Sequence, residues 1–147
     1  MSIENLLIRL ANINDSGAIY RLNKDGFGYE YDKDKTVERM QYILTHSRDK
    51  IFVAQLNNEV VGYVHASDYE CTYSDSLKNI LALVVDESKH DFGIGKQLLN
   101  AAEQWAKEDG SGGVRLVSGF NREKAHGFYQ HCGYEYRKNQ KNFVKKF

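Results

Sequence analysis

The 147-residue sequence has no proline, only two cysteines, no net charge and no long apolar run. Without proline, the breaks between helices and strands have to come from its 12 glycines and from clusters of Asn and Asp. No apolar stretch approaches the ~20 residues that a membrane helix needs, and the first residues lack the basic-then-apolar layout of a secretory signal. We therefore expect no membrane association.

The two cysteines, Cys71 and Cys132, are too few for a disulfide framework and do not form a Cys-x-x-Cys motif. Together with the missing signal, they predict a cytoplasmic protein in which both thiols are reduced. None of the five histidines is paired with a second ligand at the spacing of a metal site. We therefore expect no bound metal.

The balance of 20 basic and 20 acidic residues differs from the basic excess of nucleic-acid-binding proteins, so we expect no nucleic-acid partner. The charges are nevertheless uneven. Residues 1–75 carry 8 basic and 12 acidic side chains, whereas residues 76–147 carry 12 basic and 8 acidic ones. We interpret this asymmetry as two halves that face small partners of opposite charge.

The length and a hydrophobic fraction of 41% are typical of one folded domain over residues 1–147. The hydrophobic pattern alternates between the periods of strands and helices and predicts an α+β fold about a mixed sheet. Strands are predicted over residues 6–10, 51–56, 60–66, 77–85 and 114–120, helices over residues 12–24, 36–47, 95–109 and 121–134, and a closing hairpin over residues 134–137 and 142–147. Thr36 is the expected cap of the second helix, and strand 77–85 looks apolar enough at its end to be buried on both faces.

Residues 83–99 (LVVDESKHDFGIGKQLL) read as a buried strand, a polar loop with glycines and a long helix. Free N–H groups and the positive end of the helix dipole make such a turn a natural phosphate site. Gly93 and Gly95 allow close approach of the backbone and positive φ, and His90 and Lys96 add donors. A turn that uses its glycines only for packing is the alternative that this pattern leaves open.

Two known nucleotide motifs do not fit this turn. The Rossmann pattern has a third glycine where Leu98 stands, and the phosphate-binding P-loop has glycine where His90 stands and Ser or Thr where Gln97 stands. A dinucleotide-dependent oxidoreductase would therefore rest on the Gly-x-Gly spacing alone.

Two segments in order, HDFGIGKQLL (90–99) and NREKAHGFYQHCGY (121–134), resemble the motifs of the GCN5-related N-acetyltransferase (GNAT) superfamily. Its acetyl-CoA loop reads Gln/Arg-x-x-Gly-x-Gly/Ala, and its later helix commonly reads Asn…Ala…Phe-Tyr…Gly-Phe/Tyr. His90 departs from the usual Gln or Arg, and Asp91 stands where glycine is frequent. The resemblance implies an α+β fold with a mixed, mostly antiparallel central sheet, flanked by helices and splayed around the acetyl-CoA site.

The resemblance also implies acetyl-CoA as the co-substrate. The end of the central strand would pair its backbone with the pantetheine arm and polarise the acetyl carbonyl, and the loop would hold the diphosphate. The residues implied in cofactor binding are Leu83, Val84, Val85, His90, Asp91, Phe92, Gly93, Ile94, Gly95, Lys96, Asn121 and Tyr129. A helix cap is an equally good interpretation of Asn121.

Tyr129 matches the family tyrosine that lies close to the CoA sulfur, which implies a catalytic role as the acid that protonates the leaving thiolate. A phenol suits this role because it stays protonated at neutral pH; an ordinary core tyrosine is the alternative. The attacking amine also has to lose a proton, yet strand 77–85 offers no carboxylate or imidazole. Asp68, Glu70 and His65, on or just after the preceding strand, are the candidate bases.

The loop between the first two helices interleaves aromatic rings with carboxylates, which suits a cationic amine. The expected acceptor-binding residues are Tyr29, Glu30, Tyr31 and Asp68. The predicted function is direct transfer of acetyl from acetyl-CoA to a small cationic primary amine in a ternary complex. A protein N-terminus or lysine is another acceptor, and a non-catalytic acyl-CoA-binding or sensor module is the alternative function. Family habit also allows a homodimer.

Overall fold

The computed structural model describes residues 5–147, which fall into two compact units, one that ends at Leu116 and one over Val117–Phe147. The first unit contains β1 (Leu6–Leu10), η1 (Ile13–Asp15), α1 (Ser16–Leu22), η2 (Asn23–Phe27), α2 (Lys33–His46), β2 (Lys50–Leu56), β3 (Glu59–Tyr69), β4 (Leu77–Val85), η3 (Glu87–Lys89), α3 (Ile94–Glu108) and β5 (Val114–Leu116). The second contains α4 (Glu123–His131).

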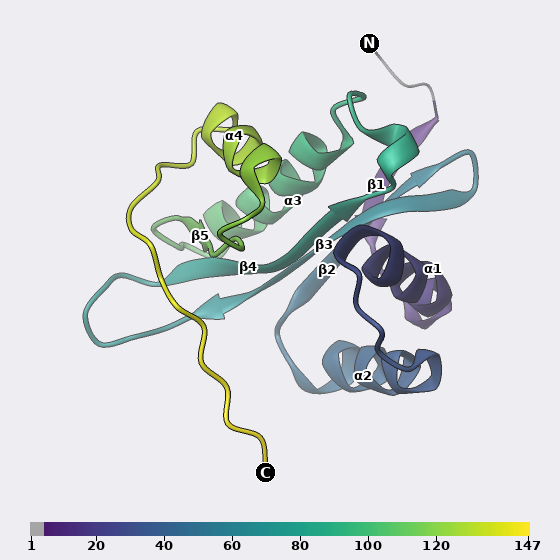
Figure 1. Ribbon diagram of the computed structural model, residues 1–147, viewed down its shortest axis with the longest axis horizontal. Coiled ribbons are helices and arrows are strands. Elements are labelled where there is room, and N and C mark those ends of the chain that lie inside the picture. The colour runs from purple at the N-terminus through teal and green to yellow at the C-terminus, as the bar shows by residue number, and fades with distance from the viewer. Residues whose placement is uncertain (1–4) are drawn as a thin grey trace. The chain divides into compact units, whose positions relative to one another are not determined.

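A five-stranded sheet in the order β1-β2-β3-β4-β5 forms the centre of the first unit (Figure 1). The first four strands pair antiparallel, and β5 runs parallel to β4. The expected mixed, mostly antiparallel sheet is confirmed. Pairing with β5 covers only residues 78–80 of β4, so within the described chain residues 82–85 pair with β3 alone and Leu81 pairs with neither strand. The sheet therefore opens along this stretch of β4.

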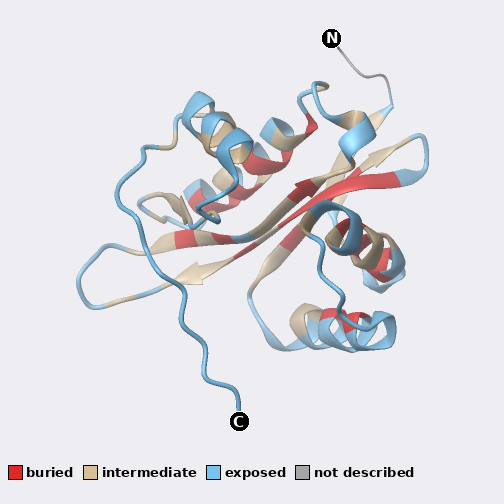
Figure 2. Ribbon diagram, in the orientation of Figure 1, coloured by how far each residue is buried: buried red, intermediate tan, exposed pale blue. Residues whose placement is uncertain are grey.

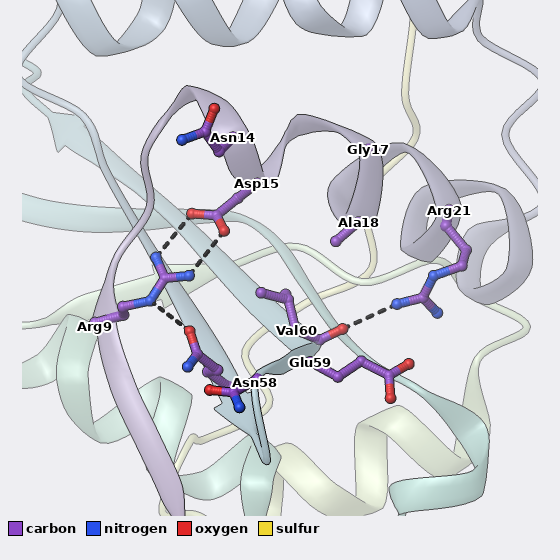
Figure 3. Close-up of a pocket in the computed structure, with 10 residues that line it drawn as sticks. Arg9, Asn14, Asp15, Gly17, Ala18, Arg21, Asn58, Glu59 and Val60 are labelled. Atoms are coloured by element: carbon purple, nitrogen blue, oxygen red, sulfur yellow. Dashed lines mark hydrogen bonds and ion pairs between the residues drawn. The ribbon is translucent and has the colours of Figure 1, made fainter.

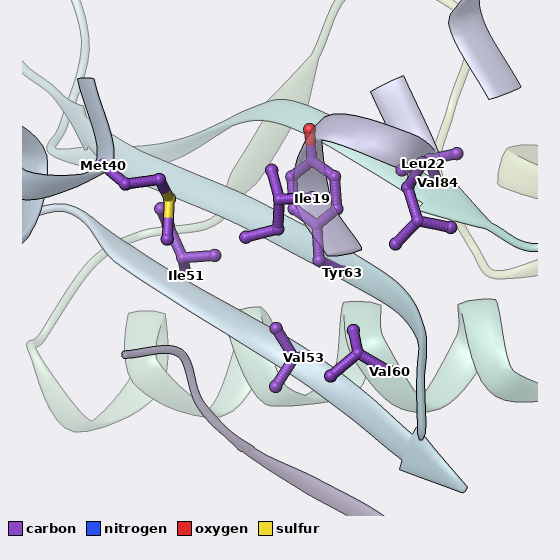
Figure 4. Close-up of a cluster of buried hydrophobic side chains, with 8 residues drawn as sticks. All are labelled: Ile19, Leu22, Met40, Ile51, Val53, Val60, Tyr63 and Val84. Atoms are coloured by element: carbon purple, nitrogen blue, oxygen red, sulfur yellow. The ribbon is translucent and has the colours of Figure 1, made fainter. Parts of the chain in front are cut away.

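Helices cover both faces of the sheet, with α1 and α2 on one face and α3 on the other (Figure 1). Because side chains alternate along a strand, each strand contributes to both layers. The core layer between these two helices and the sheet consists of Ile19, Leu22, Met40, Ile51, Val53, Val60, Tyr63 and Val84 (Figure 4). On the α3 face Leu98 comes close to β3, because an added Cβ at Gly62 would lie 3.2 Å from its Cδ1 atom. Figure 2 shows the buried residues concentrated in the sheet and in the inner sides of these helices.

A bulge interrupts β4 where the sheet opens. The register passes from Ala66↔Ile80 to His65↔Ala82, which leaves Leu81 as an extra residue. Leu81 is 53% exposed. At the end of the strand, where burial on both faces was expected, Val84 is buried on the face of α1 and α2, but Leu83 and Val85 on the opposite face are only partly buried, so that expectation is wrong for the second face.

The first two helices differ from the sequence prediction at their ends. The segment predicted as one helix over 12–24 divides into the 3₁₀ turn η1, the helix α1 and the π-helical turn η2. Helix α2 begins at Lys33 rather than after Thr36, because the Asp32 carboxylate accepts a hydrogen bond from the Lys35 amide at 2.9 Å. Thr36 lies buried in the first turn and donates its hydroxyl to the Asp32 carbonyl.

Helix α3 agrees closely with the prediction for residues 95–109, and its buried side includes Ile94, Leu98, Ala102 and Trp105. Its strong 3.6-residue period is the reason. No helix in residues 5–147 is long and apolar enough to cross a membrane.

The last segments of the chain differ most from the prediction. The strand predicted over 114–120 ends at Leu116, and no strand forms in the described residues 117–147. The closing hairpin is therefore wrong. Two strands alone are marginal in water without a further strand or helix to pack on. The apolar side chains of the segment, including Phe143 and Phe147, are exposed instead.

Candidate functional site

The turn between β4 and α3 presents open backbone donors. Gly93 precedes the helix in the left-handed conformation, with φ of +77°, and no side chain of the described residues caps the first turn. The amides of Ile94, Gly95 and Lys96 therefore lack partners within the helix, as in any helix that begins without a cap. Gly95 is helical, and the second positive φ falls instead on Asp91, at +73°.

His90 closes the loop onto the strand that it follows. Its Nε2 atom lies 3.0 Å from the Val85 carbonyl oxygen, so the ring donates Nε2–H to that oxygen. The sequence predicted His90 as a donor beside the helix N-terminus. The structure uses this donor to hold the end of β4, which leaves the α3 amides as the donors of the turn.

The beginning of the same loop is tied to β3 and α1. The Asp86 carboxylate accepts hydrogen bonds from the Ser88 amide and hydroxyl, and these bonds hold the pKa of Asp86 below its ordinary value. The Asp86 amide donates to the Val61 carbonyl at 2.7 Å. Arg21 donates to the Val60 carbonyl at 2.9 Å and lies 3.5 Å from the Asp86 carboxylate. The loop is thus anchored before it reaches the glycines.

The end of β4 offers a second set of backbone groups. Leu83, Val84 and Val85 pair with β3 on one side, and β5 does not reach them on the other. Because N–H and C=O groups alternate between the two edges of a strand, some of these groups face the opening. An extended ligand can add to such an edge through main-chain hydrogen bonds.

The loop after η2 borders an open surface cavity of about 600 Å³. Tyr29 and Tyr31 are 60% and 49% exposed, and Phe27 packs on Tyr29 with ring centroids 5.2 Å apart. The residues that line the cavity are Asn23, Gly28, Tyr29, Glu30 and Tyr31. Three of the four residues predicted to bind the acceptor therefore meet around one cavity.

Two residues that sequence reasoning missed hold this loop against the sheet. The Tyr63 hydroxyl donates to the Asn23 side-chain oxygen, and burial raises the pKa of Tyr63 far above its ordinary value. An added Cβ at Gly26 would lie 2.3 Å from Cγ2 of Val84. The π-helical turn thus packs directly against β4. Turns of this kind often occur at functional sites. The two glycines among aromatic residues were the signal available in the sequence.

Asp68, the fourth predicted acceptor-binding residue, lies elsewhere. It pairs with Lys78, whose ammonium is 2.6 Å from Asp68, 2.5 Å from Asp109 and 4.2 Å from the centre of the Trp105 ring. Lys78 is only 1% exposed, and Arg48 binds both carboxylates from outside. These ion pairs lower the pKa of Asp68 and of Asp109. The contact with Trp105 of α3 places the cluster on the α3 face, away from the Tyr29 loop.

The other two candidate bases also have partners. Glu70 accepts a hydrogen bond from the Ser76 hydroxyl at 2.6 Å, in the segment between β3 and β4. His65 Nε2 lies 2.8 Å from the Asp49 carboxylate, with 14% of the histidine side chain exposed. His65 alternates with Val64 and shares the sheet face of Tyr63, under α1 and α2.

Asn121 and Tyr129 belong to the second unit. Helix α4 follows Arg122, with no side-chain hydrogen bond at its cap, so Asn121 is not the cap. Tyr129 is half-buried on α4 beside Phe128 and Tyr134, with ring centroids 5.5 and 6.2 Å away. Burial raises the pKa of Tyr129, which keeps its phenol protonated.

A smaller cavity of about 400 Å³ lies where β1, α1 and the β2–β3 hairpin meet (Figure 3). Arg9 donates two hydrogen bonds of 2.9 Å to the Asp15 carboxylate and a third to Gln55. The charges at its centre therefore satisfy one another and tie β1 to η1. Among residues 5–147, no three His, Cys, Asp or Glu side chains gather as a metal site.

Comparisons with known proteins agree on one family. The model of the acetyltransferase (GNAT) family matches residues 17–134, which run across both units. A curated relative, an uncharacterized N-acetyltransferase of Methanocaldococcus jannaschii, is 26% identical over 91% of this chain. The chain spans 61% of the length of that relative.

Solved structures show the same fold over nearly the whole chain. An aminoglycoside acetyltransferase from an uncultured soil metagenomic sample, in complex with trehalose, is 26% identical with a TM-score of 0.81, and 97% of each chain is covered. An aminoglycoside N-acetyltransferase in complex with CoA has a TM-score of 0.86 over 97% of this chain and 95% of its own. It is 18% identical, so its likeness concerns the fold.

Proposed function

The chain belongs to the acetyltransferase (GNAT) family, and from that premise we propose that it moves the acetyl group of acetyl-CoA directly to the primary amine of a small cationic molecule. In this proposal residues 1–147 act as one acetyltransferase domain, because the family match runs across both units. Acetyl-CoA and the amine are bound together, so that no acetyl-enzyme forms.

The observation that carries the proposal is the pairing of an open strand edge with an uncapped helix end in one unit. The backbone of residues 83–85 would bind the pantetheine arm, and a backbone N–H there would polarise the acetyl carbonyl. The loop after it leads to the free amides of α3, where the CoA diphosphate would meet N–H donors and the positive end of the helix dipole. CoA in the similar aminoglycoside N-acetyltransferase structure supports this choice of cofactor.

The acceptor would enter the cavity lined by Tyr29, Glu30 and Tyr31. Two exposed aromatic rings and a carboxylate favour a cation, through cation–π contact and Coulomb attraction. The cavity of about 600 Å³ has room for a small polyamine or for one or two aminosugar rings. Aminoglycoside acetyltransferases among the similar structures support the same class of acceptor.

Tyr129 would supply a proton to the CoA thiolate as it leaves. A protonated phenol is needed for this, and burial raises the pKa of Tyr129 in that direction. Tyr136 provides a matched control in the same unit, because it is 67% exposed and its hydroxyl donates to the nearby Asn139 side chain.

The test measures thiol release from acetyl-CoA with a panel of polyamines, aminoglycosides and peptides bearing a free N-terminus or lysine. We expect turnover with small cationic amines, a loss of about 100-fold in kcat for Tyr129→Phe, and none for Tyr136→Phe. Acetylation of the peptides alone would move the acceptor to a protein N-terminus or lysine. Tight acetyl-CoA binding without turnover on any amine would favour the non-catalytic binding module.

A further inference from the structure

The attacking amine has to lose a proton before it can react. A primary amine with a pKa of about 10 is almost wholly protonated at neutral pH. Strand β4 carries no carboxylate or imidazole at its open end, residues 81–85. Two of the three candidate bases are engaged in other interactions. Asp68 pairs with Lys78 and Arg48 on the α3 face, and Glu70 accepts a hydrogen bond from the Ser76 hydroxyl.

We infer that His65, oriented by Asp49, is the base that takes this proton; the inference rests on the proposed acetyl transfer. The 2.8 Å contact of Nε2 with Asp49 assigns that nitrogen as the donor, which leaves the lone pair on Nδ1. A carboxylate that fixes one ring nitrogen in this way orients the other as a base. Both side chains keep some exposure, at 14% for His65 and 22% for Asp49.

His65 lies between the cavity proposed for the acceptor and the open stretch of β4 proposed for acetyl-CoA. Two residues earlier on the same face of β3, Tyr63 donates to Asn23, which lines the acceptor cavity. Across the sheet, His65 pairs with Ala82 of β4, within the open stretch. The spacings are about 7 Å along the strand and about 5 Å between strands. His65 therefore lies on the same face as Tyr63 and beside Ala82, one residue before the proposed cofactor edge 83–85 begins.

None of the strand neighbours in register with His65 carries a charge. Ile51 faces it from β2 and Ala82 from β4, and neither side chain titrates. On β3 the adjacent positions of the same face are Tyr63, whose pKa is raised, and Ser67.

One proton passes from the ammonium to Nδ1 of His65, and the freed nitrogen lone pair forms a C–N bond with the acetyl carbon. The C–S bond breaks and the sulfur keeps its electron pair. The nitrogen loses its second proton as the amide forms, one proton ends on the CoA thiol by way of Tyr129, and His65 returns the other to solvent.

The test compares His65→Gln and Asp49→Asn with the control His46→Gln, whose ring stacks on Tyr42 at the surface. The best amine of the panel is used at pH 7 and at a pH near its own pKa. We expect kcat/KM at pH 7 to fall at least about 100-fold for His65→Gln and about tenfold for Asp49→Asn, with the acetyl-CoA Kd unchanged. Near the pKa of the amine both losses shrink, because the nucleophile is already neutral. His46→Gln stays at the wild-type rate.

Activity of His65→Gln within threefold of wild type at pH 7 would overturn the role of His65 and leave the acetyl transfer standing. An equal loss at both pH values would also overturn it, because it would show a structural effect. If His65→Gln does not fold, Asp49→Asn provides the same test. A loss of kcat/KM that is smaller near the pKa of the amine than at pH 7 supports the role of His65, and an equal loss at both pH values overturns it. A wild-type protein that acetylates no amine overturns the proposed function and this role together.

Discussion

Gly26, in the π-helical turn before the Tyr29 loop, packs closely against Val84 of β4. Adding one methyl group at Gly26 therefore tests whether this packing positions the loop that is proposed to bind the acceptor. In Gly26→Ala the added Cβ would lie 2.3 Å from Cγ2 of Val84, well inside van der Waals contact. Val84 cannot turn away cheaply, because it is buried and its β-branched side chain is stiff at χ1. Either the π-helical turn or β4 has to move.

The expected cost is that of overpacking a buried site, about 1–3 kcal/mol. For a chain of this size it corresponds to a fall in Tm of roughly 3–9 °C. Since the turn carries the cavity and β4 carries the cofactor edge, the KM for the amine should rise together with the Kd for acetyl-CoA. Thermal unfolding, isothermal titration with acetyl-CoA and steady-state kinetics measure the three quantities.

Gly17→Ala is the matched control, because nothing lies within 4 Å of its added Cβ and Gly17 sits in α1. It should raise stability by up to about 1 kcal/mol through helix propensity alone. In the double variant Gly26→Ala/Val84→Ala the clashing methyl is gone, so the two changes should cost less together than the sum of their separate effects. Additive costs, or a Gly26→Ala protein as stable as Gly17→Ala, would refute the reasoning.

Two further predictions concern charge. Asp91 has φ of +73°, which favours glycine, and its carboxylate belongs to the loop proposed to hold the diphosphate. Asp91→Gly should add roughly 1 kcal/mol of stability and tighten acetyl-CoA binding, whereas Asp91→Asn should tighten binding alone; unchanged binding in both would contradict a phosphate site there. The lowered pKa values of Asp68 and Asp109 mean that their contribution to stability is complete above the unfolded pKa of about 4 and is lost as the pH falls below it. Acid unfolding of Lys78→Met should show a weaker pH dependence between about pH 4 and 2, and an unaltered profile would exclude Lys78 from the cluster.

The hydrophobic periodicity of the sequence was sufficient to predict the bounds of the elements whose apolar residues recur regularly. Strand β4 begins and ends at the predicted residues, and α3 shifts by one residue, because their apolar patterns persist over 9 and 15 positions. The glycines before α3 and the aromatic–acidic loop were visible for the same reason, since each motif lies in one continuous stretch. Family membership followed from two such stretches.

Tertiary structure decided what depends on partners far apart in the chain. The sequence made Asp68, Glu70 and His65 equal candidates, and only strand register separated them, by placing Asp68 on the α3 face beside Lys78 and His65 on the other face beside Asp49. The bulge at Leu81 and the early end of β5, which open the edge of β4, are likewise pairing events with no local signal. A side chain's residue type sets the chemistry it can perform, but the packing of distant strands and helices sets what it faces.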